Sequence, residues 1–368
     1  MHELSVHTLV RARARKLTFA GAALVVAIVA LEVLSLCAVG TATAAPPPVA
    51  TASGSSGLVA AQQSLASGEK PSAVTVSPSA RVDAVMTYDT KDGYVLLFGG
   101  ANGSGLLHDS WKFAAGTWTP LYPAVAPPGQ AWLTMTYDAK NGYVVLLDGL
   151  QTWKFVGGVW SQLSPKRSPT QLIGASMAYD AKDGYVVLFG GFNGTTYSSA
   201  TWKFVGGQWT KLSLAVRPSA RTYVTLAYDA ADSAIVLFGG CHTAAPCTSG
   251  YFLADTWEFS GGTWTEIVTT PHPSARAGYM MTYDITDGYI LLFGGCDQSN
   301  CSTPFADTWT FSGGKWTHQI PSPHPEARVL GLMAYDTKSK YAVLFGGVGT
   351  AKVYSDTWKY SAGAWKKL

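Results

Sequence analysis

The chain has 368 residues, which is too long for one ordinary domain and predicts either two domains or an array of repeats. Only 13% of the residues are charged, whereas glycine (39), tryptophan (13) and tyrosine (18) are abundant, so the composition excludes a disordered chain, a coiled coil and a helical bundle. The net charge is +3. Taking away the four basic and two acidic residues before position 45 leaves 22 basic and 21 acidic residues, so no nucleic-acid partner is expected.

The N-terminal segment is predicted to carry the rest of the chain out of the cytoplasm. Residues 17–40 are apolar apart from Glu32, residues 1–16 before them hold four basic residues, and no Lys or Arg follows until Lys70. This asymmetry places residues 1–16 in the cytoplasm and everything after residue 40 outside. Residues 17–40 are either a transmembrane signal anchor or a signal peptide cleaved after the small residues 42–44. The folded part is therefore expected outside the cell membrane, or secreted if cleavage occurs.

Residues 41–77 are rich in Ala, Pro, Ser, Thr and Gly. Such a segment buries too little apolar area to fold, so we expect a disordered stalk between the membrane and the folded part.

Cysteine use agrees with export, because four of the five cysteines form two close pairs. The pairs are Cys241 with Cys247 and Cys296 with Cys301. Four cysteines allow three pairings; two local disulfides are the expected arrangement, and a zinc site is the rival one. Three sequons predict glycosylation, at Asn102, Asn193 and Asn300.

A Tyr-Asp dipeptide and two tryptophans recur six times. Tyr-Asp begins at positions 88, 137, 179, 228, 283 and 335, a spacing of 42 to 55 residues that is typical of propeller blades. The first tryptophan of each unit is Trp111, Trp153, Trp202, Trp257, Trp309 or Trp358. The second follows seven residues later, at Trp118, Trp160, Trp209, Trp264, Trp316 or Trp365.

Residues 169–212 show the order of elements within one unit. An apolar strand over 174–179 is followed by Asp183-Gly184, which predicts a two-residue hairpin with a type I′ turn. A second strand covers 185–189 and ends in Gly-Gly; a third covers 201–204 and a fourth covers 208–212. The sequence thus predicts one four-stranded antiparallel sheet per unit.

These units resemble the kelch repeat, whose marks are an apolar strand ending in Gly-Gly, a variable loop and a tryptophan on the outer strands. Leu-Phe-Gly-Gly occurs at 97–100, 188–191, 237–240, 292–295 and 344–347. The resemblance implies an all-β, six-bladed kelch-type β-propeller over residues 78–368, with four antiparallel strands in each blade. The blades are expected at about 78–123, 124–165, 166–214, 215–269, 270–321 and 322–368. It does not imply one function, because kelch propellers include binding proteins and a few enzymes.

The recurring residues are interpreted as structural. We expect the Gly-Gly pairs to allow close backbone approach and the Trp and Tyr rings to fill the space between blades. The second unit departs from the pattern, with Leu147-Asp148-Gly149 in place of Phe-Gly-Gly and few residues before Trp153. Blade 2 is therefore predicted to keep its sheet and to lack a binding loop.

Strand direction assigns the loops to two ends of the ring. The hairpins after the first and third strands share one end, here called the hairpin face. The loops after the second strands share the other end with the linkers between blades, and this end is here called the variable-loop face. The latter receives both cysteine pairs, all three sequons and the longest loops, 240–255 and 295–307. Because variable loops on a rigid scaffold are the usual place of recognition, we expect binding at this face.

Four arginines recur seven residues before the Tyr of Tyr-Asp, at Arg81, Arg221, Arg276 and Arg328. They are candidate binding residues that could hold carboxylates at the channel mouth. The alternative is a structural salt bridge in each repeat, with Asp255, Asp307 or Asp356 as the partner. Units two and three have Gln130 and Leu172 at this position.

His272 and His324 occupy matching Pro-His-Pro linkers on the same face, near His108 and His242. They are candidate binding residues, and a copper site of the galactose-oxidase kind is the competing interpretation. We expect no metal and no cofactor, because the exported cysteines are already paired and no Ser/His/Asp or paired-carboxylate pattern is present.

Together these features predict a monomeric extracellular module that binds a surface protein or a glycan through its variable-loop face, tethered to the membrane through residues 17–40. A secreted enzyme with its site at the channel mouth, and a purely structural adhesion module, remain as alternatives.

Overall fold

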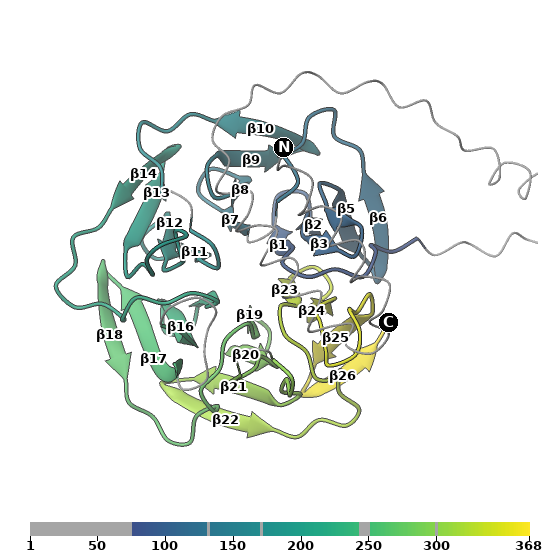
Figure 1. The fold of residues 1–368 in the computed structure, drawn as a ribbon, viewed down its shortest axis with the longest axis vertical. Helices are drawn as coiled ribbons and strands as arrows, with labels where there is room; N and C mark the ends of the chain where they lie inside the picture. Colours follow the sequence, from purple (N-terminus) through teal and green to yellow (C-terminus); the bar gives the residue numbers. More distant parts are fainter. Residues whose placement is uncertain (1–75, 131–132, 170–171, 243–250, 299–300) are drawn as a thin grey trace, which may run out of the picture.

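The computed structural model describes residues 76–130, 133–169, 172–242, 251–298 and 301–368. These residues form six four-stranded antiparallel sheets arranged in a ring, which confirms the predicted six-bladed propeller (Figure 1). Residues 1–16, 17–40 and almost all of 41–77, with the predicted membrane segment and stalk, lie outside the described residues. Within the described part of the chain, no helix is long and apolar enough to cross a membrane.

Each blade follows the chain from the centre of the ring outward. Blade 1 contains β1 (Val85–Asp89), β2 (Tyr94–Phe98), β5 (Ser110–Ala114) and β6 (Thr117–Leu121), with the small hairpin of β3 (Ala101–Asn102) and β4 (Gly105–Leu106) in its loop. Blade 2 contains β7 (Thr134–Asp138), β8 (Tyr143–Leu147), β9 (Thr152–Val156) and β10 (Val159–Leu163). Blade 3 contains β11 (Ser176–Asp180), β12 (Tyr185–Phe189), β13 (Thr201–Val205) and β14 (Gln208–Lys211).

The second half of the ring repeats this order. Blade 4 contains β15 (Leu226–Asp229), β16 (Ala234–Cys241), β17 (Phe252–Ser260) and β18 (Thr263–Ile267). Blade 5 contains β19 (Met280–Asp284), β20 (Tyr289–Phe293), β21 (Thr308–Ser312) and β22 (Lys315–Gln319). Blade 6 contains β23 (Leu332–Asp336), β24 (Tyr341–Phe345), β25 (Thr357–Ser361) and β26 (Ala364–Lys367).

The hairpin after the first strand is longer than the sequence predicted. In blade 3 the strands pair up to Asp180 and Tyr185, so the loop has the four residues 181–184 rather than the two residues Asp183-Gly184. The Asp180 carboxylate accepts hydrogen bonds from the backbone N–H groups of Lys182 and Asp183, and Gly184 lies at φ 72°. The prediction of a type I′ hairpin was wrong because the Asp of Tyr-Asp caps the turn with its side chain.

The hydrophobic core lies between adjacent blades. The second strand of each blade is almost fully buried, because its two faces pack against the sheets on either side. Six clusters of buried side chains each combine residues from two neighbouring blades. Contacts between blades therefore contribute to stability alongside the pairing within them.

The second tryptophan of every repeat is the main side chain at these junctions. Each of the six is at most 6% exposed, and its indole N–H donates to a Thr or Ser on the third strand of the preceding blade. The pairs are Trp118–Thr357, Trp160–Ser110, Trp209–Thr152, Trp264–Thr201, Trp316–Thr256 and Trp365–Thr308, at 2.9–3.0 Å. The prediction that tryptophans fill the space between blades is confirmed for this set.

Packing also closes the ring. Blade 6 meets blade 1 through a cluster that includes Val95, Trp118 and Phe345, and β1 contacts β23 as the other first strands contact their neighbours. The sheet of blade 6 contains β23 to β26 and the sheet of blade 1 contains β1, β2, β5 and β6, so each draws its strands from one continuous repeat.

Candidate functional site

The variable-loop face is built from the loops after the second strands and from the linkers that lead into the first strands. In blade 4 the strands β16 and β17 extend into this loop, as far as Cys241 and from Phe252. In blade 2 the loop is only residues 148–151, closed by a hydrogen bond from Asp148 N to Gln151 O. The prediction that blade 2 keeps its sheet without a long loop is confirmed.

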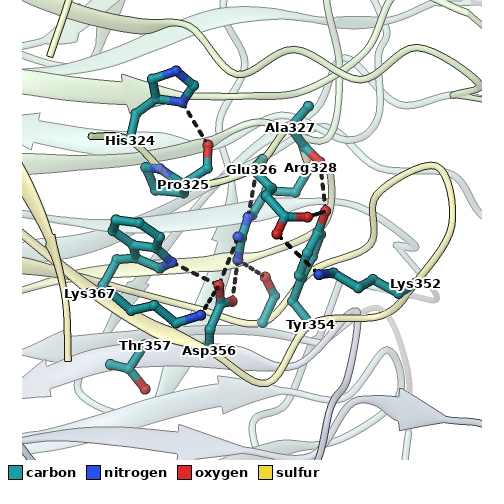
Figure 2. A network of polar contacts seen from close by, with 12 residues as sticks. His324, Pro325, Glu326, Ala327, Arg328, Lys352, Tyr354, Asp356, Thr357 and Lys367 are labelled. Carbon is teal, nitrogen blue, oxygen red and sulfur yellow. Dashed lines mark hydrogen bonds and ion pairs between the residues drawn. The ribbon is translucent and has the colours of Figure 1, made fainter. Parts of the chain in front are cut away.

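The four recurring arginines each form a two-pronged ion pair with an aspartate of their own blade. The pairs are Arg81–Asp109, Arg221–Asp255, Arg276–Asp307 and Arg328–Asp356, with N–O distances of 2.6–2.7 Å. Each guanidinium also donates to the first carbonyl of the Gly-Gly pair, and each aspartate accepts from the indole N–H of the first tryptophan of its blade. Figure 2 shows this arrangement around Arg328 and Asp356.

These ion pairs hold the loop against the sheet. Each arginine side chain is at most 1% exposed. Burial alone would raise the pKa of Asp255, but the hydrogen bonds and charge of Arg221 hold that pKa below its usual value, and the other three aspartates behave in the same way. The predicted salt bridges with Asp255, Asp307 and Asp356 are confirmed. Ligand contact by the arginines stays a prediction, and their burial gives it no support.

The arginine backbones join neighbouring blades. The N–H of Gly347 in blade 6 donates to Arg81 O in blade 1 at 3.0 Å, and Arg81 N donates to Tyr354 O at 3.3 Å. The corresponding N–H to carbonyl bonds link Gly191 to Arg221, Gly240 to Arg276 and Gly295 to Arg328. Each arginine position thus fixes the preceding blade's loop and its own.

Blades 2 and 3 lack both partners of the ion pair. Where the others have Arg and Asp, blade 2 has Gln130 and Gln151, and blade 3 has Leu172 and Ala200. In blade 2 another aspartate accepts the hydrogen bond of the first tryptophan: Asp148 Oδ2 accepts from Trp153 Nε1 at 3.0 Å. In blade 3 the indole N–H of Trp202 has no acceptor among the described residues.

A cavity of about 500 Å³ lies where blade 3 lacks this pair. Its wall includes Leu172, Ala200 and Trp202, and its rim carries Lys211 and Arg217. The other lining residues supply mainly hydroxyl and amide groups, from Asn193, Thr196, Tyr197, Ser198, Ser199, Thr201 and Ser213. The cavity is therefore polar, with two basic side chains and no acidic one among its described lining residues.

The two candidate histidines are exposed on the linkers. His272 Nδ1 lies 2.8 Å from Pro273 O and His324 Nδ1 lies 2.9 Å from Pro325 O, each within its own linker. Within the described ranges, no three His, Cys, Asp or Glu side chains are close enough to hold a metal ion. Arg217 occupies the matching position of the linker before blade 4, four residues ahead of Arg221.

The central channel holds a second cavity, of about 400 Å³, lined by the first strands of all six blades. Its described lining residues are apolar, Thr, Ser and Tyr, without an acid, a histidine or a basic residue. At the variable-loop end, a chain of backbone hydrogen bonds runs around the channel. The N–H of Tyr223 donates to Gly174 O, that of Gly278 to Tyr223 O, and that of Leu330 to Gly278 O. These hydrogen bonds join blades 3, 4, 5 and 6.

Asp83 occupies the same position in blade 1 as Tyr223 in blade 4, two residues after the arginine and at positive φ. Burial raises the pKa of Asp83 to about 8. Burial also raises the pKa of Tyr223, and the charges of Asp83 and Tyr197 add to this effect. A carboxyl group with a pKa raised to about 8 thus lies close to Tyr223, which no sequence pattern indicated.

The second predicted disulfide is present, between Cys296 and Cys301. Cys247, the predicted partner of Cys241, lies outside the described residues, as does the sequon Asn300. Asn102 is partly exposed and Asn193 is exposed at the rim of the blade 3 cavity, where its side chain accepts hydrogen bonds from Thr195 N and Thr196 N. Glycosylation of these residues stays a prediction.

Asp109 was missed by the sequence analysis, although a signal for it exists. Each aspartate of an ion pair stands two residues before the first tryptophan, in the order Asp, Thr or Ser, Trp. The cavity of blade 3 was missed because it lies where this blade has Leu172 and Ala200 in place of the arginine and aspartate of four other blades.

Solved structures support the propeller fold. No family model matches the chain, and no curated protein matches it. Among solved structures, the chain is similar to the protein described as "Structure of YjhT", with a TM-score of 0.57 and 14% sequence identity over 79% of this chain and 98% of that chain. At this identity the similarity shows the propeller fold alone.

Proposed function

We propose that this protein is an exported, membrane-tethered kelch-type propeller that binds a surface protein or a glycan through its variable-loop face. The observation that carries the proposal is the cavity of blade 3. Its volume, about 500 Å³, is in the range of small-ligand sites, and loop and linker residues form its walls together with strand residues of β13 and β14. The disulfide between Cys296 and Cys301 is consistent with an extracellular place.

The experiment that tests this proposal compares two matched substitutions in blade 3. Thr196→Trp narrows the cavity from its exposed rim, whereas Val205→Trp adds the same side chain at the exposed hairpin face of the same blade. The purified protein and both variants are applied to glycan arrays and to arrays of surface proteins. We expect Thr196→Trp to lose a partner that Val205→Trp retains. Equal binding by all three proteins would contradict the proposal.

An enzyme with its site at the channel mouth is the second candidate, and one observation favours it. Asp83, whose pKa is raised to about 8, has Tyr223 near enough for its charge to raise the tyrosine pKa, and such shifts are common at catalytic sites. Against it, the described lining of the channel cavity contains no acidic, basic or histidine side chain. The test is a screen of carbohydrate substrates with the protein and with Asp83→Asn. Turnover that is lost in Asp83→Asn would favour the enzyme.

A further inference from the structure

Blade 6 shows how this fold binds a carboxylate beside the first tryptophan. The Asp356 carboxylate accepts from Arg328 at 2.7 and 3.2 Å and from Trp358 Nε1 at 2.8 Å, and Lys367 Nζ lies 3.8 Å away (Figure 2). Lys367 reaches this place because it pairs with Trp358 across β25 and β26. One carboxylate is thus held by a guanidinium, an indole N–H and an ammonium group.

Blade 3 retains two of these donors without the carboxylate. Trp202 pairs with Lys211 across β13 and β14, in the same register as Trp358 with Lys367. Ala200 stands where blade 6 has Asp356. The corresponding lysine position in the other blades is Pro120, Gln162, Glu266 and His318, so only blades 3 and 6 have lysine there.

Arg217 supplies a further basic group in place of the missing arginine. It enters from the linker, where its Nε donates to Ser199 Oγ at 3.2 Å and its Nη1 donates to Leu214 O at 2.6 Å. Neither Lys211 nor Arg217 forms an ion pair within the part of the chain that the structure describes. Both line the cavity, whose described walls contain no Asp or Glu.

We infer that the blade 3 cavity binds the carboxylate of an aspartate or glutamate side chain presented by a partner polypeptide. The carboxylate takes the place that the chain's own aspartate occupies in four other blades, and accepts from Trp202 Nε1, Lys211 and Arg217. A peptide source is favoured because the carboxylate that blade 6 holds beside its first tryptophan belongs to an aspartate side chain, Asp356. This inference rests on the proposed function and specifies the chemistry of its partner.

The test uses two short blocked peptides, one with a central Glu and one with a central Gln, titrated into the full protein. Binding is followed by the indole N–H resonance of Trp202 in nitrogen-15 NMR spectra, assigned with Trp202→Phe. We expect the Glu peptide to shift this resonance and the Gln peptide to leave it unchanged. Ala200→Asp places the missing carboxylate inside the cavity, as in the other blades, and is expected to weaken Glu-peptide binding at least tenfold.

Lysine variants provide a matched pair. Lys211→Gln is expected to weaken binding at least fivefold, whereas Lys367→Gln, at the filled site of blade 6, is expected to leave binding unchanged. Thermal melting of each variant verifies that it is folded.

Three results would overturn the inference: no shift with either peptide, an equal shift with both, or a shift with glucuronate alone, which would assign the site to a sugar acid. Failure of the proposed function is separate. If Thr196→Trp removes binding of an array partner while Ala200→Asp does not, the cavity is a binding site and only the carboxylate assignment is wrong.

Discussion

Trp118 Nε1 donates a hydrogen bond of 2.9 Å to Thr357 Oγ1, which joins blade 1 to blade 6 across 239 residues of sequence. The five other junctions have the same bond at the same place. The closing junction therefore carries the same tryptophan hydrogen bond as the other five junctions of the ring.

Thr357→Val tests the contribution of this bond to closure. The substitution keeps the shape of the side chain and leaves the buried Trp118 N–H without its acceptor, so the free energy of unfolding should fall by about 1–3 kcal/mol. Urea denaturation measures the change. Thr201→Val, which removes the equivalent bond from Trp264 within the ring, is the matched control and should cost a similar amount. A much smaller loss for Thr357→Val would mean that the junction of blades 1 and 6 is already open.

Trp209→Ala should destabilise the protein by about 3–5 kcal/mol, because it empties a packed site between blades 2 and 3. Trp209 is 3% exposed, and its ring centroid lies 4.9 Å from that of Phe204. Trp209→Phe retains most of the packing and loses only the bond to Thr152, so it should cost less. A thermal melt followed by circular dichroism compares the two, and an unchanged melt for Trp209→Ala would refute the packing role.

The Arg221–Asp255 pair is expected to show strong coupling. Asp255→Ala leaves a buried guanidinium without its counter-charge and should cost about 3 kcal/mol, at the low end for a buried pair because Asp255 is partly exposed. Blade 3 already has Leu and Ala at these two positions, so Arg221→Leu with Asp255→Ala copies a natural solution. The double variant should lose less stability than the sum of the single changes. A double-mutant cycle by urea unfolding measures this, and additive losses would argue against coupling.

The same pair predicts a pH dependence. Burial alone would raise the pKa of Asp255, but Arg221 lowers it below the value of the unfolded chain, about 3.9. The stabilisation is thus complete above about pH 4 and is lost as the pH falls through the lower folded-state pKa. The difference in unfolding free energy between the wild type and Asp255→Asn should be constant from pH 7 to 5 and should shrink below about pH 4. A difference that grows on acidification would show the wrong sign.

The hairpin face offers a stabilising substitution. Asp180 Oδ2 is buried and has no hydrogen-bond partner among the described residues, whereas in blade 2 Asn141 Nδ2 donates to Asp138 Oδ2 at 2.7 Å. Asp183→Asn places the same amide beside Asp180 and removes a like charge, so we expect a gain of about 0.5–1.5 kcal/mol.

The reverse change in blade 2, Asn141→Asp, is the control and should destabilise. Urea unfolding of both variants measures the effect. Asp232→Asn is the equivalent change in blade 4, where Asp229 Oδ2 is also buried without a partner among the described residues. If neither Asp183→Asn nor Asp232→Asn raised the free energy of unfolding, the prediction would be wrong.

The propeller ring was predictable because the same motif, with Tyr-Asp, glycines and two tryptophans in fixed order, occurs six times in the sequence. The salt bridges were visible as an alternative for the same reason. The hairpin was mispredicted from Asp183-Gly184, because the residue that sets the loop length is the capping Asp180, three positions before Asp183.

The blade 3 cavity depended on information that the sequence does not state directly. Leu172 was visible as a departure from the arginine pattern. Its meaning required the strand register, which shows that Lys211 lies opposite Trp202. Asp83 was missed because its environment comes from residues distant in the chain.

Because the closing junction carries the same tryptophan hydrogen bond as the other five, this bond marks no blade as the first. Each linker joins one complete four-stranded unit to the next. A circular permutant could therefore begin at any linker, with the present ends of the propeller joined by a short connection. In evolutionary terms, whole units can be duplicated, exchanged or rotated in order without breaking a sheet. A single unit such as blade 3 can then lack the ion pair within the blade while the packing of its neighbours keeps the ring closed.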